Sequence, residues 1–167
     1  TGADHAELAA CRQVAAACLH GVDLDPLAVE LARRSLWLLT GAPAPAGSYL
    51  ATTLRRGDAL LGLDPDAPAP HGSRRHADAL VADFFAGDPR PRSPFHWALE
   101  LPAVFARDNP GFDVIVGNPP FLGGRQITTH LGARYSAWLC RQQPGSSGAA
   151  DLSARFFRRA FTLLRRG

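Results

Sequence analysis

The sequence predicts an α/β fold, and three observations support this. A short apolar stretch around Val22 ends at the acidic residue Asp23, and a segment with helical periodicity follows it directly. The β-branched residues 114–116 form a run that is typical of a buried central strand, and Gly117 marks the point where the chain leaves it. The chain has 167 residues, of which 46% are hydrophobic and 20% charged, which is ordinary for one globular domain with a core.

The first forty residues are predicted to form a helix, a short strand over 19–23 and a second helix. Because Asp25 precedes Pro26, a residue favoured at the first helical position, Asp25 is predicted to cap the second helix. Gly41 and Pro43 are predicted to end it. The first helix should carry one face of Leu8, Cys11, Ala15 and Cys18. The apolar face of the second should carry Ala28, Leu31, Ala32, Ser35 and Leu39.

The middle of the chain is predicted to contain a linker, a helix and an aromatic segment. Residues 64–73 are rich in Pro, Gly and Ala and read as an exposed linker, and residues 89–94 form a second breaker segment. Between them a helix is expected over 74–85, with Leu80, Val81, Phe84 and Phe85 facing inward. Residues 95–97 are predicted to be packing residues rather than ligands, and Phe112 to be a core residue.

The C-terminal part is predicted to hold a second linker and a final helix. The linker covers residues 143–149, and Asp151 is predicted to be the N-cap of the helix that follows. Its apolar stripe should consist of Phe156, Phe157, Ala160, Phe161 and Leu164.

Composition excludes several classes of protein. The net charge of +3 and the pI near 9.1 permit a nucleic-acid partner, but every one of the 18 basic residues is arginine, so a compositional bias explains the charge equally well. The three cysteines show no C-x-x-C spacing and no His cluster accompanies them, which argues against a metal site and a disulfide scaffold. No stretch suits a membrane span and no leader opens the chain, so a cytoplasmic protein is expected.

The segment from Asn118 to Phe121 predicts a pocket for an amino group. Pro119 and Pro120 hold the residues before them extended, so the loop is stiff. Neither proline has an N–H, and the segment therefore offers acceptors, the Asn118 side-chain oxygen and the Pro119 carbonyl. Two acceptors match the two hydrogens of one exocyclic amine, and Phe121 adds an apolar plate on which a planar base could stack. Taken without its neighbours, the tetrapeptide could equally be a rigid turn.

With these residues the chain resembles the adenine-specific amino-methyltransferases of DNA, whose catalytic motif reads Asn/Asp-Pro-Pro-Phe/Tyr/Trp after a hydrophobic strand. It is most similar to the large bacterial enzymes of restriction–modification and phage-defence systems, of the type IIG kind. The resemblance covers the whole chain and rests on an ordered set of pieces: GVDLDPLAVELARRSLWLL, RRGDALLG, FHWALELPAVF leading to GFDVIVGNPPFLGG, and ADLSARFFRRAFTLLRRG. It implies a Rossmann-like class I methyltransferase fold that uses S-adenosylmethionine.

The resemblance also implies a cofactor site. A carboxylate at the tip of the second strand, Asp23 with its neighbour Leu24, would accept the ribose hydroxyls of S-adenosylmethionine. A third strand at residues 54–56 would be followed by Asp58, which with Ala59 would bind the cofactor adenine. Two simpler interpretations remain open at this point: Asp23 as an exposed loop residue, and the Gly-Asp pair at Asp58 as an ordinary turn.

The expected reaction is direct methyl transfer to the N6 amino group of an adenine flipped out of double-stranded DNA. Asn118, Pro119, Pro120 and Phe121 would form the catalytic loop, with no strong base and no covalent enzyme intermediate. The Pro-Cys motif of the ring-carbon methyltransferases is absent from the sequence. Similar motifs serve enzymes that methylate RNA or a protein glutamine, and these are the alternatives.

The resemblance further implies an incomplete catalytic domain over 1–167. The glycine-rich loop that follows the family's first strand is absent from the sequence, and further strands are expected after Gly167. A target-recognition domain would lie in a separate part of the parent protein. A non-catalytic remnant of the fold is therefore a second alternative.

Overall fold

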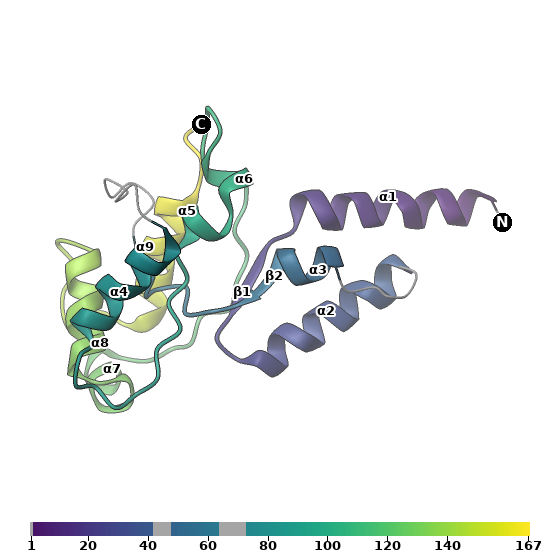
Figure 1. Cartoon of the computed structure of the whole chain (residues 1–167). Coiled ribbons are helices and arrows are strands. Elements are labelled where there is room, and N and C mark those ends of the chain that lie inside the picture. Colours follow the sequence, from purple (N-terminus) through teal and green to yellow (C-terminus); the bar gives the residue numbers. More distant parts are fainter. Residues whose placement is uncertain (1, 42–47, 64–72) are drawn as a thin grey trace. The chain divides into compact units, whose positions relative to one another are not determined.

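The computed structural model describes residues 2–41, 48–63 and 73–167 (Figure 1). The chain folds into two compact units, Thr1–Asp58 and Ala59–Gly167. The linker predicted at 64–73 and the helix-ending Pro43 fall almost wholly outside the described residues. No helix among those described is long and apolar enough to cross a membrane.

The first unit contains a two-stranded parallel sheet and its crossover helix. In chain order its elements are α1 (Gly2–Cys18), β1 (Gly21–Asp23), α2 (Pro26–Thr40), α3 (Ser48–Thr53) and β2 (Leu54–Arg56). The strands pair with Gly21 opposite Leu54 and Asp23 opposite Arg56, and α2 packs against both (Figure 1). A parallel pair joined through a helix is an α/β arrangement, as predicted. The strand expected at 54–56 is confirmed.

Helix α2 begins and ends where the sequence predicts. The Asp25 carboxylate accepts a hydrogen bond from the Leu27 N–H at 2.9 Å, so Asp25 is the N-cap. Gly41 lies in the left-handed region with φ of 55°, and its N–H bonds back to Leu38, which closes the helix.

The predicted apolar face of α2 is wrong. Leu31 and Leu39 are 55% and 71% exposed, whereas Val29 and Thr40 are buried. The inward face also includes Arg33, whose guanidinium donates to the Leu54 carbonyl of β2. The inward face of α2 thus includes an arginine that bonds to a strand carbonyl, whereas the spacing of apolar residues predicted leucine there. In α1 the prediction holds for Ala15, which is buried, but Cys11 and Cys18 are exposed free thiols.

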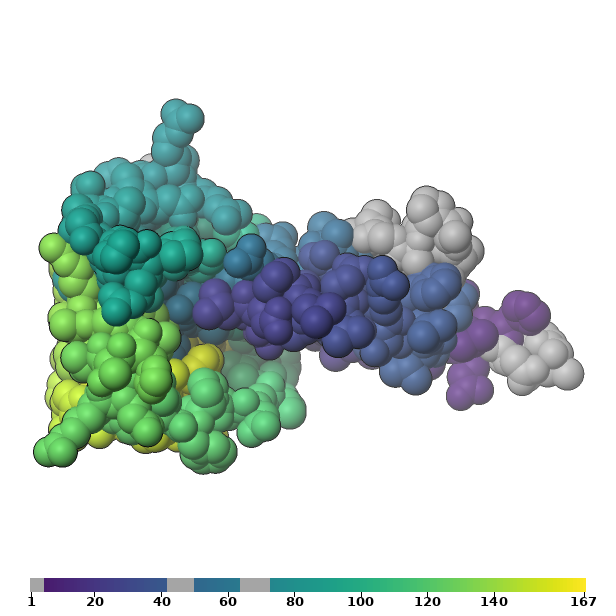
Figure 2. All heavy atoms as spheres, turned by 90° about the horizontal axis from the view of Figure 1, so that it is seen from below, coloured from purple at the N-terminus to yellow at the C-terminus, as the bar shows by residue number. Residues whose placement is uncertain are grey.

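The second unit is a helical body around one apolar core. Its helices are α4 (Arg74–Phe84), α5 (Trp97–Glu100), α6 (Pro102–Phe105), α7 (Gly124–Leu131), α8 (Ala133–Gln142) and α9 (Leu152–Leu163). In the space-filling view its teal, green and yellow atoms form one closely packed body (Figure 2). The buried core cluster consists of Leu60, Leu61, Val81, Phe85, Ile127, Tyr135, Trp138, Leu139 and Leu152.

The predicted helix over 74–85 is present as α4. Val81 and Phe85 are buried as expected, and Phe84 packs edge-on against Trp138 with ring centroids 5.0 Å apart. Leu80 is 42% exposed and does not face inward. The expected packing role of residues 95–97 is confirmed for Phe95 and His96, which are 2% and 1% exposed.

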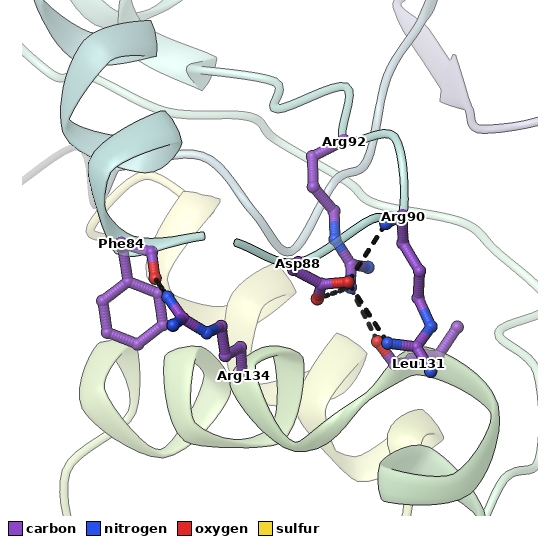
Figure 3. Close-up of polar contacts among 6 residues, drawn as sticks. All are labelled: Phe84, Asp88, Arg90, Arg92, Leu131 and Arg134. Atoms are coloured by element: carbon purple, nitrogen blue, oxygen red, sulfur yellow. Dashed lines mark hydrogen bonds and ion pairs between the residues drawn. The ribbon is translucent and has the colours of Figure 1, made fainter. Parts of the chain in front are cut away.

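A buried ion pair fixes the breaker segment to the turn between α7 and α8. The Asp88 side chain is 4% exposed and accepts from Arg92 at 2.8 Å, and Arg92 also donates to the Leu131 carbonyl at 2.7 Å (Figure 3). Hydrogen bonds from Arg92 and Arg90 lower the pKa of the Asp88 carboxyl to about 2. The Arg92 guanidinium also lies over the Tyr135 ring. The segment is therefore ordered despite its prolines.

The predicted stripe of α9 is wrong, because the helix faces the core with its arginines. Phe157 and Phe161 are 69% and 80% exposed, whereas Arg155 and Arg159 are 1% and 3% exposed. Arg155 donates to the Leu139 and Ser147 carbonyls, and Arg159 donates to the Gly62 carbonyl. These buried guanidinium groups satisfy backbone carbonyls that no aliphatic side chain could serve.

Candidate functional site

The β-branched run at 114–116 is exposed and forms no strand with the described residues, so the prediction of a buried strand is wrong. Val114, Ile115 and Val116 are 73%, 38% and 91% exposed. Within the described part of the chain, residues 114–121 make no backbone hydrogen bond. A sequence can suit a strand, but a strand forms only where a neighbour completes its ladder.

Pairing begins just before this run, at Phe112. The Phe112 N–H donates to the Leu163 carbonyl at 2.9 Å, and the Arg165 N–H donates to the Phe112 carbonyl at 3.0 Å. This is one rung of a parallel ladder, with Phe112 opposite Leu164. The Phe112 ring packs edge-on against Trp97 and Phe105, which supports its predicted role in packing. The segment that leads to residues 118–121 is thus anchored at Phe112.

A second anchor lies directly after Phe121. The Leu122 carbonyl accepts from the Leu152 N–H at 2.8 Å, at the start of α9. Hydrogen bonds from the Ser153 hydroxyl and N–H lower the pKa of the Asp151 carboxyl. Asp151 is also the N-cap of α9, as predicted, since it accepts from the Ser153 N–H at 2.8 Å. Sequence spacing contained no signal for the hydrogen bond between Leu152 and Leu122.

Between the two anchors, Asn118, Pro119, Pro120 and Phe121 lie at the surface of the second unit. The Asn118 side chain is exposed and makes no hydrogen bond with any residue that the structure describes. Its carbonyl oxygen and that of Pro119 are available as acceptors. The Phe121 side chain is 81% exposed. The arrangement offers two acceptors and one aromatic plate to a planar ligand that carries an amino group.

The second candidate region lies where the two parallel strands of the first unit end. The Gly57 N–H donates to the Asp23 carbonyl at 2.9 Å, and Arg56 donates to the Leu24 carbonyl at 3.3 Å. The Asp25 N–H donates to one carboxylate oxygen of Asp23 at 2.8 Å. That bond orients the exposed carboxylate, whose second oxygen makes no contact with the described residues. The structure therefore brings Asp23 and Leu24 together with the end of β2.

Asp58 and Ala59 follow at the end of β2. Asp58 is 9% exposed, and the Ala59 carbonyl accepts from the Trp97 indole N–H at 3.0 Å. The acceptor chemistry of Asp23 and Asp58 fits the hydroxyl and amino groups of a nucleoside. Leu24 offers an apolar side chain, which is 51% exposed. Asp23, Leu24 and Asp58 belong to the first unit, whereas Ala59 and the loop at 118–121 belong to the second, and each residue is placed within its own unit.

The described residues contain no group of three or more His, Cys, Asp or Glu side chains that could hold a metal ion.

The comparisons with known proteins give one match. The family model described as Eco57I restriction-modification methylase matches residues 17–167. A search of curated proteins and a search of solved structures find no match. The matched range includes both candidate regions, from Asp23 to Phe121.

Proposed function

The chain belongs to the Eco57I restriction-modification methylase family, and on that premise we propose that it transfers a methyl group from S-adenosylmethionine to the N6 amino group of adenine in DNA. Methylation of DNA is the activity that the family name carries. The choice of an adenine amino group rests on the loop at 118–121. Its two open acceptors and exposed aromatic ring fit a base that bears one NH₂ group.

Asp23 and Asp58 are the residues that would hold the cofactor. The oriented Asp23 carboxylate would accept from the ribose hydroxyls, and Asp58, at the end of the neighbouring strand, from the adenine amino group. S-adenosylmethionine supplies an electrophilic methyl carbon when bound. The methyl carbon would leave its sulfur as it bonds to N6, and the nitrogen would then lose one proton to solvent, so no residue of the chain has to form a covalent bond.

Asn118 and Pro119 act on the accepting nitrogen. The lone pair of an adenine amino group is delocalised into the ring, so the nitrogen is a poor nucleophile. Acceptance of both amino hydrogens by Asn118 Oδ1 and the Pro119 carbonyl draws the nitrogen toward tetrahedral geometry. The same contacts stabilise the positive charge that develops there only in the transition state. Phe121 would stack on the flipped base and keep it in line for attack.

The test is methyl transfer from labelled S-adenosylmethionine by the full natural chain, with unmethylated DNA, RNA and a release-factor protein offered separately. We expect label in DNA as N6-methyladenine. The Asn118→Ala variant should lose on the order of 2.7–4 kcal/mol of transition-state stabilisation, about 10²–10³ in kcat.

Two variants serve as comparisons for Asn118→Ala. Asn118→Asp keeps an acceptor oxygen and should retain part of the activity. Asn109→Ala removes another exposed asparagine, whose side chain donates to the Arg166 carbonyl, and should leave kcat unchanged. Label found in RNA or protein instead of DNA would refute the assignment, as would wild-type kcat in Asn118→Ala.

A further inference from the structure

The segment 59–63, which follows β2, is held by the side chains of two neighbouring residues. The Trp97 indole N–H donates to the Ala59 carbonyl at 3.0 Å. At the other end of the segment, the Leu63 N–H donates to His96 Nδ1 at 3.2 Å. All of these residues belong to the second unit. The segment is thus fastened at both of its ends.

The middle of the segment is held by packing. Leu60 and Leu61 are 1% and 0% exposed and belong to the core cluster. A Cβ added at Gly62 would lie 1.8 Å from the Phe95 carbonyl oxygen, so the two backbones run directly against each other there. Apolar burial has no preferred direction, whereas a hydrogen bond fixes an angle as well as a distance. The bond from the indole therefore orients the Ala59 peptide group in a way that burial does not.

Ala59 is the end of the segment that matters for the cofactor. It directly follows Asp58, which is proposed above to accept from the adenine amino group. The Ala59 N–H makes no hydrogen bond with the part of the chain that the structure describes, so it can donate to a ring nitrogen of the same adenine. Trp97 holds the carbonyl of this residue and thereby restricts the direction in which its N–H points.

Trp97 also contacts the residue that anchors the catalytic segment. Its ring packs edge-on against Phe112, with ring centroids 5.7 Å apart. The backbone of Phe112 is paired, and it anchors the segment that leads to residues 118–121. One side chain thus contacts a residue of the proposed cofactor site and the anchor of the proposed catalytic loop.

We infer that Trp97 is a positioning residue for the cofactor: its indole holds Ala59 in the orientation that binds adenine and joins it to the anchor of the catalytic loop. This inference rests on the function proposed above. A peptide group that samples several orientations binds a ligand only in the competent one, so the apparent affinity falls with the competent fraction. Misplacement of the methyl group relative to the accepting nitrogen also slows its transfer.

The experiment compares Trp97→Phe with Trp138→Phe in the full natural chain. Trp97→Phe keeps an aromatic ring but removes the donor to Ala59. Trp138 is the matched control, because it is 2% exposed and its indole nitrogen has no hydrogen-bond partner among the described residues. Trp138→Phe therefore removes buried apolar surface without removing a hydrogen bond. A third protein carries benzothienylalanine at position 97, in which sulfur replaces the indole N–H and the shape of the ring is preserved.

Three quantities are measured. They are the Kd of S-adenosylmethionine by calorimetry, the amide hydrogen exchange of Leu60 and Leu61 without ligand, and the separate kcat and KM for DNA methylation. In Trp97→Phe we expect Kd to rise roughly three- to tenfold, which corresponds to the loss of one hydrogen bond. The two amides should exchange faster than in the wild type, because the segment opens more often.

The kinetic constants separate positioning from general loosening. At saturating S-adenosylmethionine, kcat of Trp97→Phe should fall roughly tenfold, while KM for DNA stays within about twofold. Benzothienylalanine at position 97 should reproduce both the rise in Kd and the fall in kcat. Trp138→Phe should match the wild type in Kd and in kcat.

A wild-type Kd in Trp97→Phe would overturn the inference, and so would an equal rise in Kd in Trp138→Phe. A raised Kd with wild-type kcat would overturn the link to the catalytic loop. Unfolding of Trp97→Phe would show as faster exchange throughout α8 and α9, and wild-type affinity in the benzothienylalanine protein then overturns the inference. If the wild-type chain binds no S-adenosylmethionine, the proposed function fails, and the exchange of Leu60 and Leu61 still decides whether Trp97 holds the segment.

Discussion

Phe121 and Phe161 expose nearly the same fraction of their side chains, 81% and 80%, and differ in position. Phe121 ends the loop that begins at Asn118, whereas Phe161 lies on the outer face of α9. Exposure of a large aromatic side chain costs free energy in water, so equal exposure alone does not identify a binding residue. Only a substitution can separate the two.

Phe121→Ala should reduce kcat/KM for DNA, because each stacked base contributes about 1–3 kcal/mol of binding. Phe121→Tyr, which keeps the ring, should restore most of it. Phe161→Ala is the matched control and should leave kcat/KM unchanged. Steady-state kinetics on one duplex substrate measure all three. Equal losses in the two alanine variants would show that Phe121 does not stack on the base.

At the level of elements, the start of α7 packs closely against the connection from α8 to α9. A Cβ added at Gly124 would lie 2.5 Å from the Gly148 carbonyl oxygen and 2.7 Å from the Ala149 Cα, so only glycine fits without movement. A Cβ added at the neighbouring Gly123 would meet nothing within 4 Å. The two glycines therefore form a natural pair for comparison.

Gly124→Ala should destabilise the protein by about 1–3 kcal/mol, because the connection at 148–149 must shift to admit the methyl group. Gly123→Ala should change stability by no more than about 1 kcal/mol, the cost of alanine at an N-cap. Denaturant unfolding at one pH measures the difference between the variants. Equal stability of the two would mean that the connection yields freely and does not support the Leu122 anchor.

Periodicity predicted two features poorly: which residues of a helix face the core, and whether a strand-like segment forms a strand. In α9 the apolar residues Phe157 and Phe161 point outward, because Arg155 and Arg159 are needed inside to satisfy carbonyls of distant segments. The residues at 114–116 suit a strand, yet the described part of the chain gives them no neighbouring strand. The bridge to Leu164 is made by Phe112, just before the run. Both outcomes depend on which distant backbone groups require a donor or an acceptor.

At the level of the whole molecule, each unit contains a histidine that favours its neutral form. Burial, with Arg55 nearby, lowers the pKa of His20 in the first unit. In the second unit burial outweighs the opposing effects of Asp78 and Glu100 and lowers the pKa of His96, to which Arg74 contributes. The Leu63 N–H donates to His96 Nδ1 at 3.2 Å, so Nε2 carries the hydrogen toward Asp78.

Stability should therefore fall as the pH drops below about 6.5, the ordinary pKa of histidine. The unfolded chain binds protons at these positions before the folded chain does, so acid favours unfolding. Thermal unfolding between pH 8 and pH 5 measures the slope. His96→Asn keeps an acceptor for Leu63 but cannot be protonated, and its slope should be shallower than that of the wild type. The exposed His76→Asn is the control, and a wild-type slope in His96→Asn would contradict the prediction.

The sequence by itself determined the features that depend on near neighbours. Asp25 and Asp151 are N-caps and Gly41 closes a helix, because each acts on backbone groups a few residues away. The restriction that Pro119 places on the backbone of Asn118, and the lack of N–H donors at Pro119 and Pro120, likewise follow from the sequence alone. The family was also recognisable from these local motifs in their order.

Only the tertiary structure decided which parts of the chain meet. It turned the arginines of α9 inward, left residues 114–116 exposed, and joined Leu122 to Leu152. None of these follows from spacing, because burial and hydrogen bonding between distant segments depend on where every other donor, acceptor and apolar surface lies. A local pattern reports what a segment can form, and the partners that the fold brings to it determine what it does form.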